Sequence, residues 1–264
     1  MHSSPFDLYH TGISPVHGLD ARVKLVLALA FVLCVSLTPV GAWPVYLLLL
    51  AVTLSAAELA ELGLGLVLRR SLLALPFALA ALPLLVTLPG PTFASLRIGR
   101  FLISISGPGM ERFVSIVFRS WLSVQMAILL TATTPLPDLL VAFGALRLPR
   151  LLVAILALMW RYLAVLIDEA LRMMRARDAR SGCVEGRGGG SLRWRASVTG
   201  AMAGSLFLRG FERSERIHSA MLSRGYDGTI RSLSRQPPDS RSWRLMVLGL
   251  AVLAGLLLLG YRLG

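Results

Sequence analysis

The sequence is poor in the residues from which most catalytic and metal-binding sites are built. Its 264 residues include two cysteines, four histidines and 14 acidic residues. The cysteines, Cys34 and Cys183, fall in an apolar stretch and a glycine-rich linker, so they predict neither a disulfide framework nor a metal site. The histidines are scattered, whereas a metal site needs several converging donors. We therefore expect no resident metal ion and no cofactor.

A nucleotide-binding loop is also missing from the sequence. No GxxxxGK[ST] pattern occurs, and the glycine-rich stretch GRGGGS at 186–191 lacks the lysine that contacts phosphate, so we interpret it as linker. The apolar stretches contain almost no His, Asp or Glu, which an integral-membrane enzyme would need for catalysis. The chain is therefore predicted to be non-catalytic, with no catalytic residues of its own.

Apolar residues are what the chain has in abundance, at 55% of the sequence. A helix needs about 20 apolar residues to cross a bilayer, and backbone polar groups in lipid must be satisfied within the segment, which favours helices. Trp43 and Tyr46 are placed as interfacial anchors of the second span. We predict an all-α polytopic membrane protein with about five transmembrane helices, at 23–40, 45–57, 71–90, 112–133 and 244–264. The stretches 58–70 and 91–111 are expected to be loops.

The charges are concentrated in one block between the apolar spans. Of 27 Lys and Arg residues, 18 lie between Leu136 and Arg244, together with 9 of the 14 acidic residues. This placement argues against nucleic-acid binding and fits a cytoplasmic domain that follows the positive-inside bias. The predicted organisation is a polar N-terminal segment on the cytoplasmic side and a C-terminus outside, with domains at 1–22, 23–133 (four spans), 134–243 (cytoplasmic) and 244–264 (last span).

The predicted cytoplasmic domain contains three helical segments, at 135–148, 149–182 and 191–225, with a flexible linker at 182–191. On the third helix, apolar and aromatic side chains recur on one face. Residues 151–167 could instead form a sixth span, interrupted by Arg161. Because a central arginine costs about 2.5 kcal/mol or more on insertion scales, we favour an amphipathic helix on the cytoplasmic side.

Two predicted helices end on an arginine close to a glycine. Arg180 comes shortly before Gly182, and Arg224 directly before Gly225. Cations at a helix C-terminus are stabilised by about 0.3–1 kcal/mol, so each arginine could be an ordinary cap. Two matched ends favour a second interpretation, because an arginine at a helix tip can place its guanidinium in a groove of a soluble partner and bind a carboxylate there.

Two polar residues lie within the predicted fourth span. Arg119 could extend its side chain to the nearby interface. Alternatively, Arg119 and Gln125 could make polar contacts to another membrane subunit. The sequence alone does not distinguish these two interpretations.

Taken together, the sequence resembles the transmembrane T component of energy-coupling-factor (ECF) transporters, most closely the CbiQ-like cobalt subgroup. The resemblance covers nearly the whole chain and is carried by LDARVKLVLALAF, EALRMMRARDARSG and RSERIHSAMLSRGYDG. The family has an Ala-Arg-Gly-type signature at the end of each of two coupling helices. The matching tripeptides here are Ala179-Arg180-Ser181, which has serine in place of the usual glycine, and Ser223-Arg224-Gly225.

The resemblance implies a non-catalytic coupling subunit of an ATP-driven cobalt importer in the bacterial inner membrane. Its implied partners are two cytoplasmic ABC ATPases, a CbiM-like membrane substrate-binding subunit and a small accessory membrane subunit. The same role for nickel or a vitamin is an alternative, because the substrate is selected by another chain. A secondary carrier is a further alternative, although we find no inverted repeat of the kind that many carriers have.

Overall fold

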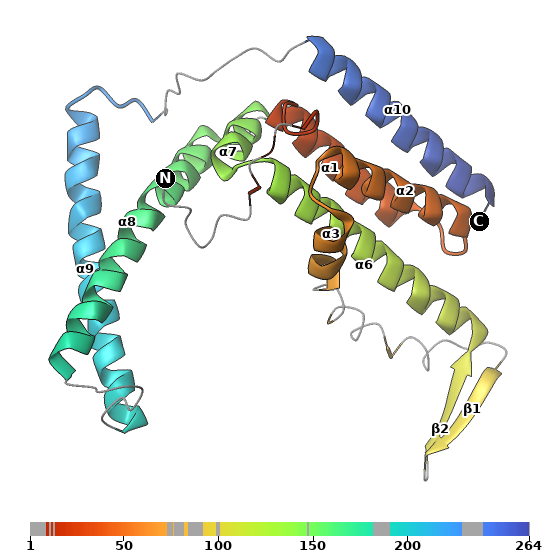
Figure 1. The fold of residues 1–264 in the computed structure, drawn as a ribbon, viewed down its shortest axis with the longest axis horizontal. Helices are drawn as coiled ribbons and strands as arrows, with labels where there is room; N and C mark the ends of the chain where they lie inside the picture. The colour runs from red at the N-terminus through yellow and green to blue at the C-terminus, as the bar shows by residue number, and fades with distance from the viewer. Residues whose placement is uncertain are drawn as a thin grey trace. The chain divides into compact units, whose positions relative to one another are not determined.

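Figure 1 presents the computed structural model of the chain, which is mainly helical. It forms two compact units, one of Phe6–Ala142 with Gln236–Gly264 and the other mainly of Phe143–Arg235. The structure describes residues 9–10, 12, 14–72, 76, 82–83, 92–98, 101–146, 148–181, 191–228 and 240–263.

The first unit is a helical bundle, as expected for an all-α membrane protein, and it also carries one small hairpin that was not expected. Helix α1 packs against both α6 and α10, and α2 also contacts these two helices. The helices of this unit are α1 (Ala21–Leu37), α2 (Trp43–Leu59), α3 (Leu64–Ser71), α6 (Gly107–Thr133), most of α7 (Leu136–Ala145) and α10 (Ser240–Leu263).

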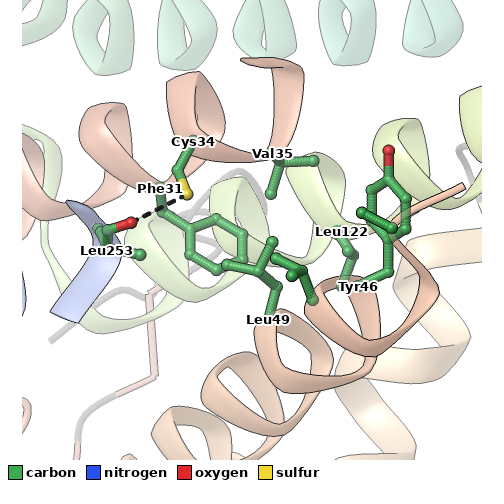
Figure 2. Packing of buried hydrophobic residues seen from close by; sticks show 9 residues of the cluster. Phe31, Cys34, Val35, Tyr46, Leu49, Leu122 and Leu253 are labelled. Carbon is green, nitrogen blue, oxygen red and sulfur yellow. Dashed lines mark hydrogen bonds between the residues drawn. The ribbon is translucent and has the colours of Figure 1, made fainter. Parts of the chain in front are cut away.

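A buried apolar cluster holds α1, α2, α6 and α10 together (Figure 2). The Phe31 ring of α1 lies among side chains of the other helices, and the Cys34 thiol donates a hydrogen bond to the Leu253 main-chain oxygen at 3.5 Å. Tyr46 is fully buried, so its predicted place as an interfacial anchor is wrong. Burial of apolar side chains at this junction fixes the arrangement of the four helices.

Two stretches predicted as loops have regular structure. In 58–70, α2 continues to Leu59 and the amphipathic segment that follows forms α3. In 91–111, β1 (Thr92–Ile98) pairs with β2 (Phe101–Ser106) in an antiparallel hairpin, and α6 begins at Gly107. The hairpin sequences TFASLRI and FLISIS are rich in β-branched and aromatic residues, a signal that the neighbouring glycines and prolines obscured. Most of the predicted third span, 71–90, lies outside the described residues.

The second unit is a pair of long helices, α8 (Arg150–Ser181) and α9 (Leu192–Leu222). Both agree closely with the segments predicted at 149–182 and 191–225. They run antiparallel (Figure 1), so the first turns of α8 lie beside the last turns of α9. The helices approach closely at Gly210, where an added Cβ would lie 3.5 Å from the side chain of Leu166.

Three described helices are long and apolar enough to cross a membrane: α6, α10 and Arg150–Arg180 of α8. Helices α2 and α7 are apolar but shorter. Length and composition therefore allow α8 to span, whereas the cost of burying Arg161 favours a position on the cytoplasmic side. The number of spans stays a prediction.

Candidate functional site

The α9 helix ends in a Schellman motif around Arg224. Gly225 has a φ of +76°, in the left-handed region that glycine adopts without strain. The Tyr226 N–H donates to the Met221 oxygen at 3.0 Å, and the Gly225 N–H donates to the Leu222 oxygen at 3.0 Å, which is the bonding pattern of this motif. The predicted glycine stop is confirmed, and it leaves Arg224 exposed at the helix end beside exposed Ser223.

The α8 helix presents its arginine in a comparable position. Arg180 is exposed in the last turn, next to exposed Ala179, and the helix ends at Ser181. Gly182 lies outside the described residues, so the role of that glycine in stopping the helix stays a prediction. Both arginines are thus exposed on the final turns of long helices, whereas their function in docking is a proposal.

The antiparallel arrangement places these two arginines at opposite ends of the second unit (Figure 1). Arg180 and Arg224 each lie about 14 residues from the contact of Gly210 with Leu166, in opposite directions. At 1.5 Å per residue, the two arginines are separated by as much as about 40 Å. One small groove could not hold both guanidinium groups at this separation. The geometry therefore suits two separate acceptor sites.

An apolar groove of about 920 Å³ lies between α8 and α9. The face predicted on α9 lines it with Phe207, Phe211, His218 and Met221, while α8 contributes apolar residues from Leu151 to Leu166. Phe207 is 71% exposed. Exposed apolar faces of this kind mark contacts with a partner or with lipid.

A polar contact that the sequence did not reveal joins the two helices. Glu169, beyond the apolar stretch 151–167, accepts a hydrogen bond from Arg172 one turn later and another from Arg209 of α9 at 2.7 Å. These two bonds hold the pKa of the Glu169 carboxyl below its usual range. The spacing of Glu169 and Arg172 was visible in the sequence, but the pairing with Arg209 depends on how the helices cross.

Arg119 is part of a polar cluster inside the bundle. Its Nε donates to the Tyr46 hydroxyl at 2.8 Å, and its Nη2 donates to the Thr38 main-chain oxygen at the end of α1. The guanidinium carbon also lies 5.9 Å from the centre of the Tyr46 ring. Arg119 therefore links α6 to the turn between α1 and α2, and a contact with another subunit stays a proposal.

Gln125 is buried between α6 and α2, at 1% exposure. Its Oε1 accepts a hydrogen bond from the Thr53 hydroxyl at 3.0 Å, while its Nε2 has no hydrogen-bond partner among the described residues. A buried amide donor without a partner costs about 1–3 kcal/mol. A contact between Gln125 and another membrane subunit would require the two helices to separate, and it stays a proposal.

The N-terminal segment forms a second polar cluster at the end of α6. Lys24 donates from Nζ to the main-chain oxygens of Thr133 at 3.0 Å and His17 at 3.2 Å. The His17 ring lies 2.7 Å from the Ser14 hydroxyl through Nδ1 and 2.9 Å from the His10 oxygen through Nε2. In the described part of the chain, no three His, Cys, Asp or Glu side chains form a group that could hold a metal ion.

Comparison with known proteins identifies related sequences over most of the chain. The family model described as CbiQ, cobalt transport protein, matches residues 12–236. The energy-coupling factor transporter transmembrane protein EcfT of Lactococcus lactis subsp. cremoris is 31% identical over 266 residues, covering 95% of each chain. The cobalt transport protein CbiQ of Rhodobacter capsulatus is 31% identical over 173 residues, covering 66% of this chain and 67% of that protein.

A further relative is longer than this chain. A putative fused cobalt transport protein CbiMQ of Methanocorpusculum labreanum is 29% identical over 226 residues, which cover 82% of this chain and 36% of the relative. The chain spans less than half the length of two of the curated relatives it matches.

Proposed function

Because the chain belongs to the CbiQ family of cobalt transport proteins, we propose that it couples ATP hydrolysis by separate ABC ATPases to the uptake of cobalt ions. Its relatives identify it as a transmembrane component of an ECF-type transporter, which is a non-catalytic transport subunit. Cobalt as the substrate and the coupling of transport to ATP hydrolysis are the proposed parts of this assignment.

The observation that carries the proposal is the placement of Arg180 and Arg224. Both are exposed at the ends of helices more than 30 residues long, and these ends point in opposite directions. A guanidinium at each end can bind a carboxylate through two parallel hydrogen bonds. We propose that each arginine, with Ala179 and Ser181 or with Ser223 and Gly225 beside it, docks into one of two cytoplasmic ATPase subunits. Motion of the ATPases would then move both ends of the helix pair.

The other proposed partners are membrane proteins. A transporter that is built from several chains needs a substrate-binding subunit. The name of the fused relative, CbiMQ, combines CbiM with CbiQ in one chain. We propose a CbiM-like partner, together with a small accessory membrane subunit. The apolar groove between α8 and α9 is suited to a partner with an apolar surface, and Arg119 and Gln125 would contact such a partner only if the bundle opened there.

The proposed location is the bacterial inner membrane. We propose that the N-terminus and the charged domain 134–243 lie on the cytoplasmic side, which the positive-inside bias supports. This placement brings both arginine ends within reach of soluble ATPases, and it assigns the lipid-facing role to the apolar helices of the bundle.

Purification of the tagged full-length chain from native membranes tests the proposal. We expect an ABC ATPase and a small membrane protein to copurify, and the complex to take up radioactive cobalt in liposomes when ATP is supplied. The double variant R180E/R224E should lose the ATPase but keep the membrane partner. Uptake of nickel or a vitamin instead would assign another substrate to the same role, and uptake by the chain alone without ATP would indicate a secondary carrier.

A further inference from the structure

Glu169 makes two hydrogen bonds at the place where α8 and α9 cross. One carboxylate oxygen accepts from Arg209 of α9 at 2.7 Å, and the other accepts from Arg172 of its own helix. The Glu169 side chain is 23% exposed, less than half the exposure of either arginine. Because Arg172 also bonds the carboxylate, it restricts the Glu169 side chain. The side chain then loses less conformational entropy when it binds Arg209.

Apolar packing contributes little to this helix pair. None of the described residues of α9 is buried, and the groove beside the crossing is open. Helices with an interdigitated core have their crossing angle set by side-chain ridges and grooves, whereas α8 and α9 make a close approach where Gly210 lies against Leu166. A small contact of this kind permits rotation. A directional ion pair one turn from the contact can restrict that rotation.

We propose that Glu169 is a positioning residue for transport coupling. Its bond to Arg209 fixes the crossing of α8 and α9 and so sets the separation of Arg180 and Arg224. This inference rests on the proposed function of the two arginine ends. In this role Glu169 touches neither a partner nor the substrate. It acts on coupling by fixing the geometry of the helix pair.

The lengths of the helices make this geometry sensitive to rotation at the crossing. Arg224 lies about 22 Å along α9 from Arg209, at 1.5 Å per residue. A rotation of about 10° at the crossing would displace that end by about 4 Å. Hydrogen bonds to a guanidinium tolerate only a few tenths of an ångström around 2.9 Å, so a loose crossing would prevent both ends from docking at once.

The first measurement is the distance between spin labels on the two helices in the full-length protein. Cysteines replace Ala176 and Ser219, both exposed, in a background without Cys34 and Cys183. We expect one narrow distance distribution at about 30 Å, from 1.5 Å per residue on each side of the contact of Gly210 with Leu166, and a broad one in Glu169→Gln. Arg209→Gln should broaden it equally, and the double variant should be no worse than either single variant. Glu212→Gln is the matched control, because its pair with Arg216 lies within α9.

The second measurement is the amount of substrate taken up per ATP hydrolysed by the reconstituted complex. Glu169→Gln should lower this ratio roughly two- to fivefold, the range expected for an ion pair of this exposure, and Glu212→Gln should leave it unchanged. Exchanging the charges in E169R/R209E, made with Arg172→Gln to avoid a like-charge neighbour, should restore both the narrow distribution and the ratio relative to Arg172→Gln alone.

The outcomes separate this inference from the proposed function. An unchanged distance distribution in Glu169→Gln would overturn the inference, and so would a broadened distribution with a normal transport ratio. Full uptake by R180E/R224E would instead overturn the proposed function, whatever the distances show. Loss of uptake in R180E/R224E with no effect of Glu169→Gln would leave the proposed function standing and remove the role assigned to Glu169.

Discussion

Lys24 near the start of α1 donates a hydrogen bond to the Thr133 main-chain oxygen at the end of α6, across 3.0 Å. Lys24 is 8% exposed, and its second bond goes to the His17 oxygen. An ammonium at the end of a helix satisfies carbonyl groups that have no partner within the helix and interacts favourably with the helix dipole. Lys24 therefore ties the N-terminal segment to the point where α6 leads into α7.

Replacing Lys24 with methionine should destabilise the bundle by about 1.5–3 kcal/mol, the range for hydrogen bonds to charged groups. Thermal unfolding of the purified protein in detergent measures the effect. Arg22→Met is the control, because Arg22 is a partly exposed neighbour whose nitrogen lies 4.0 Å from Asp20, and such pairs contribute at most about 1 kcal/mol. Equal shifts in the two variants would contradict the assigned role of Lys24.

Reversing the charge of Arg180 or Arg224 to glutamate should uncouple transport without preventing membrane insertion. In the proposed docking, repulsion from an acidic groove of the ATPase replaces attraction, and loss of one partner of a buried charge pair costs about 2–5 kcal/mol. ATPase copurification and cobalt uptake measure the effect. Arg216→Glu is the control, because Arg216 is also exposed on α9 but lies about two turns before Arg224. Normal uptake by the double reversal would exclude the docking role.

Gly225→Ala should disturb the end of α9, because alanine at a φ of +76° costs about 1–2 kcal/mol. Gly204 is a matched control within the same helix, since an added Cβ would meet nothing within 4 Å at either position. Gly204→Ala should stabilise α9 by up to about 1 kcal/mol. Hydrogen exchange of the backbone amides of residues 225 and 226 distinguishes the two variants. We expect these amides to exchange faster in Gly225→Ala and at the original rate in Gly204→Ala. Similar exchange in both would show that the left-handed glycine does not determine this helix end.

Arg119 and Tyr46 should be energetically coupled within the isolated chain. Arg119→Met and Tyr46→Phe each remove one side of a 2.8 Å hydrogen bond, and a double-mutant cycle should give a coupling of about 1–2 kcal/mol in unfolding free energy. Thr131→Val with Tyr46→Phe serves as a non-contacting control pair. Zero coupling would return Arg119 to its alternative role as a contact to another membrane subunit.

Single-cysteine labelling should place the N-terminus and the charged domain inside and the C-terminus outside. Labels at Ser191 and Ser234 should react from the cytoplasmic side only, and a label at Gly264 from the outside only, in a background without native cysteines. Ser234 and Gly264 lie outside the described residues. Labelling of Ser191 from the outside would mean that 151–167 spans the membrane and that Arg180 and Arg224 cannot both reach a cytoplasmic ATPase.

Local sequence patterns predicted much of the secondary structure. The helical segments at 149–182 and 191–225, the stop at Gly225 and the apolar face of α9 all depend on periodicity and on the conformational freedom of one glycine. The hairpin at 92–106 and helix α3 were missed because turn-forming residues nearby suggested loops. Tyr46 was assigned to the membrane interface because amphipathic rings favour that position, but a hydrogen bond from Arg119 accounts for its hydroxyl inside the bundle.

The sequence by itself determined the class of protein, because long continuous apolar runs favour helices, which satisfy their own backbone hydrogen bonds in lipid. It also placed Arg180 and Arg224 at helix ends. The tertiary structure decided which distant residues pair: Lys24 with Thr133, Arg119 with Tyr46, and Glu169 with Arg209. Such pairs depend on how helices cross, and a crossing is the outcome of packing among many side chains rather than of any local pattern.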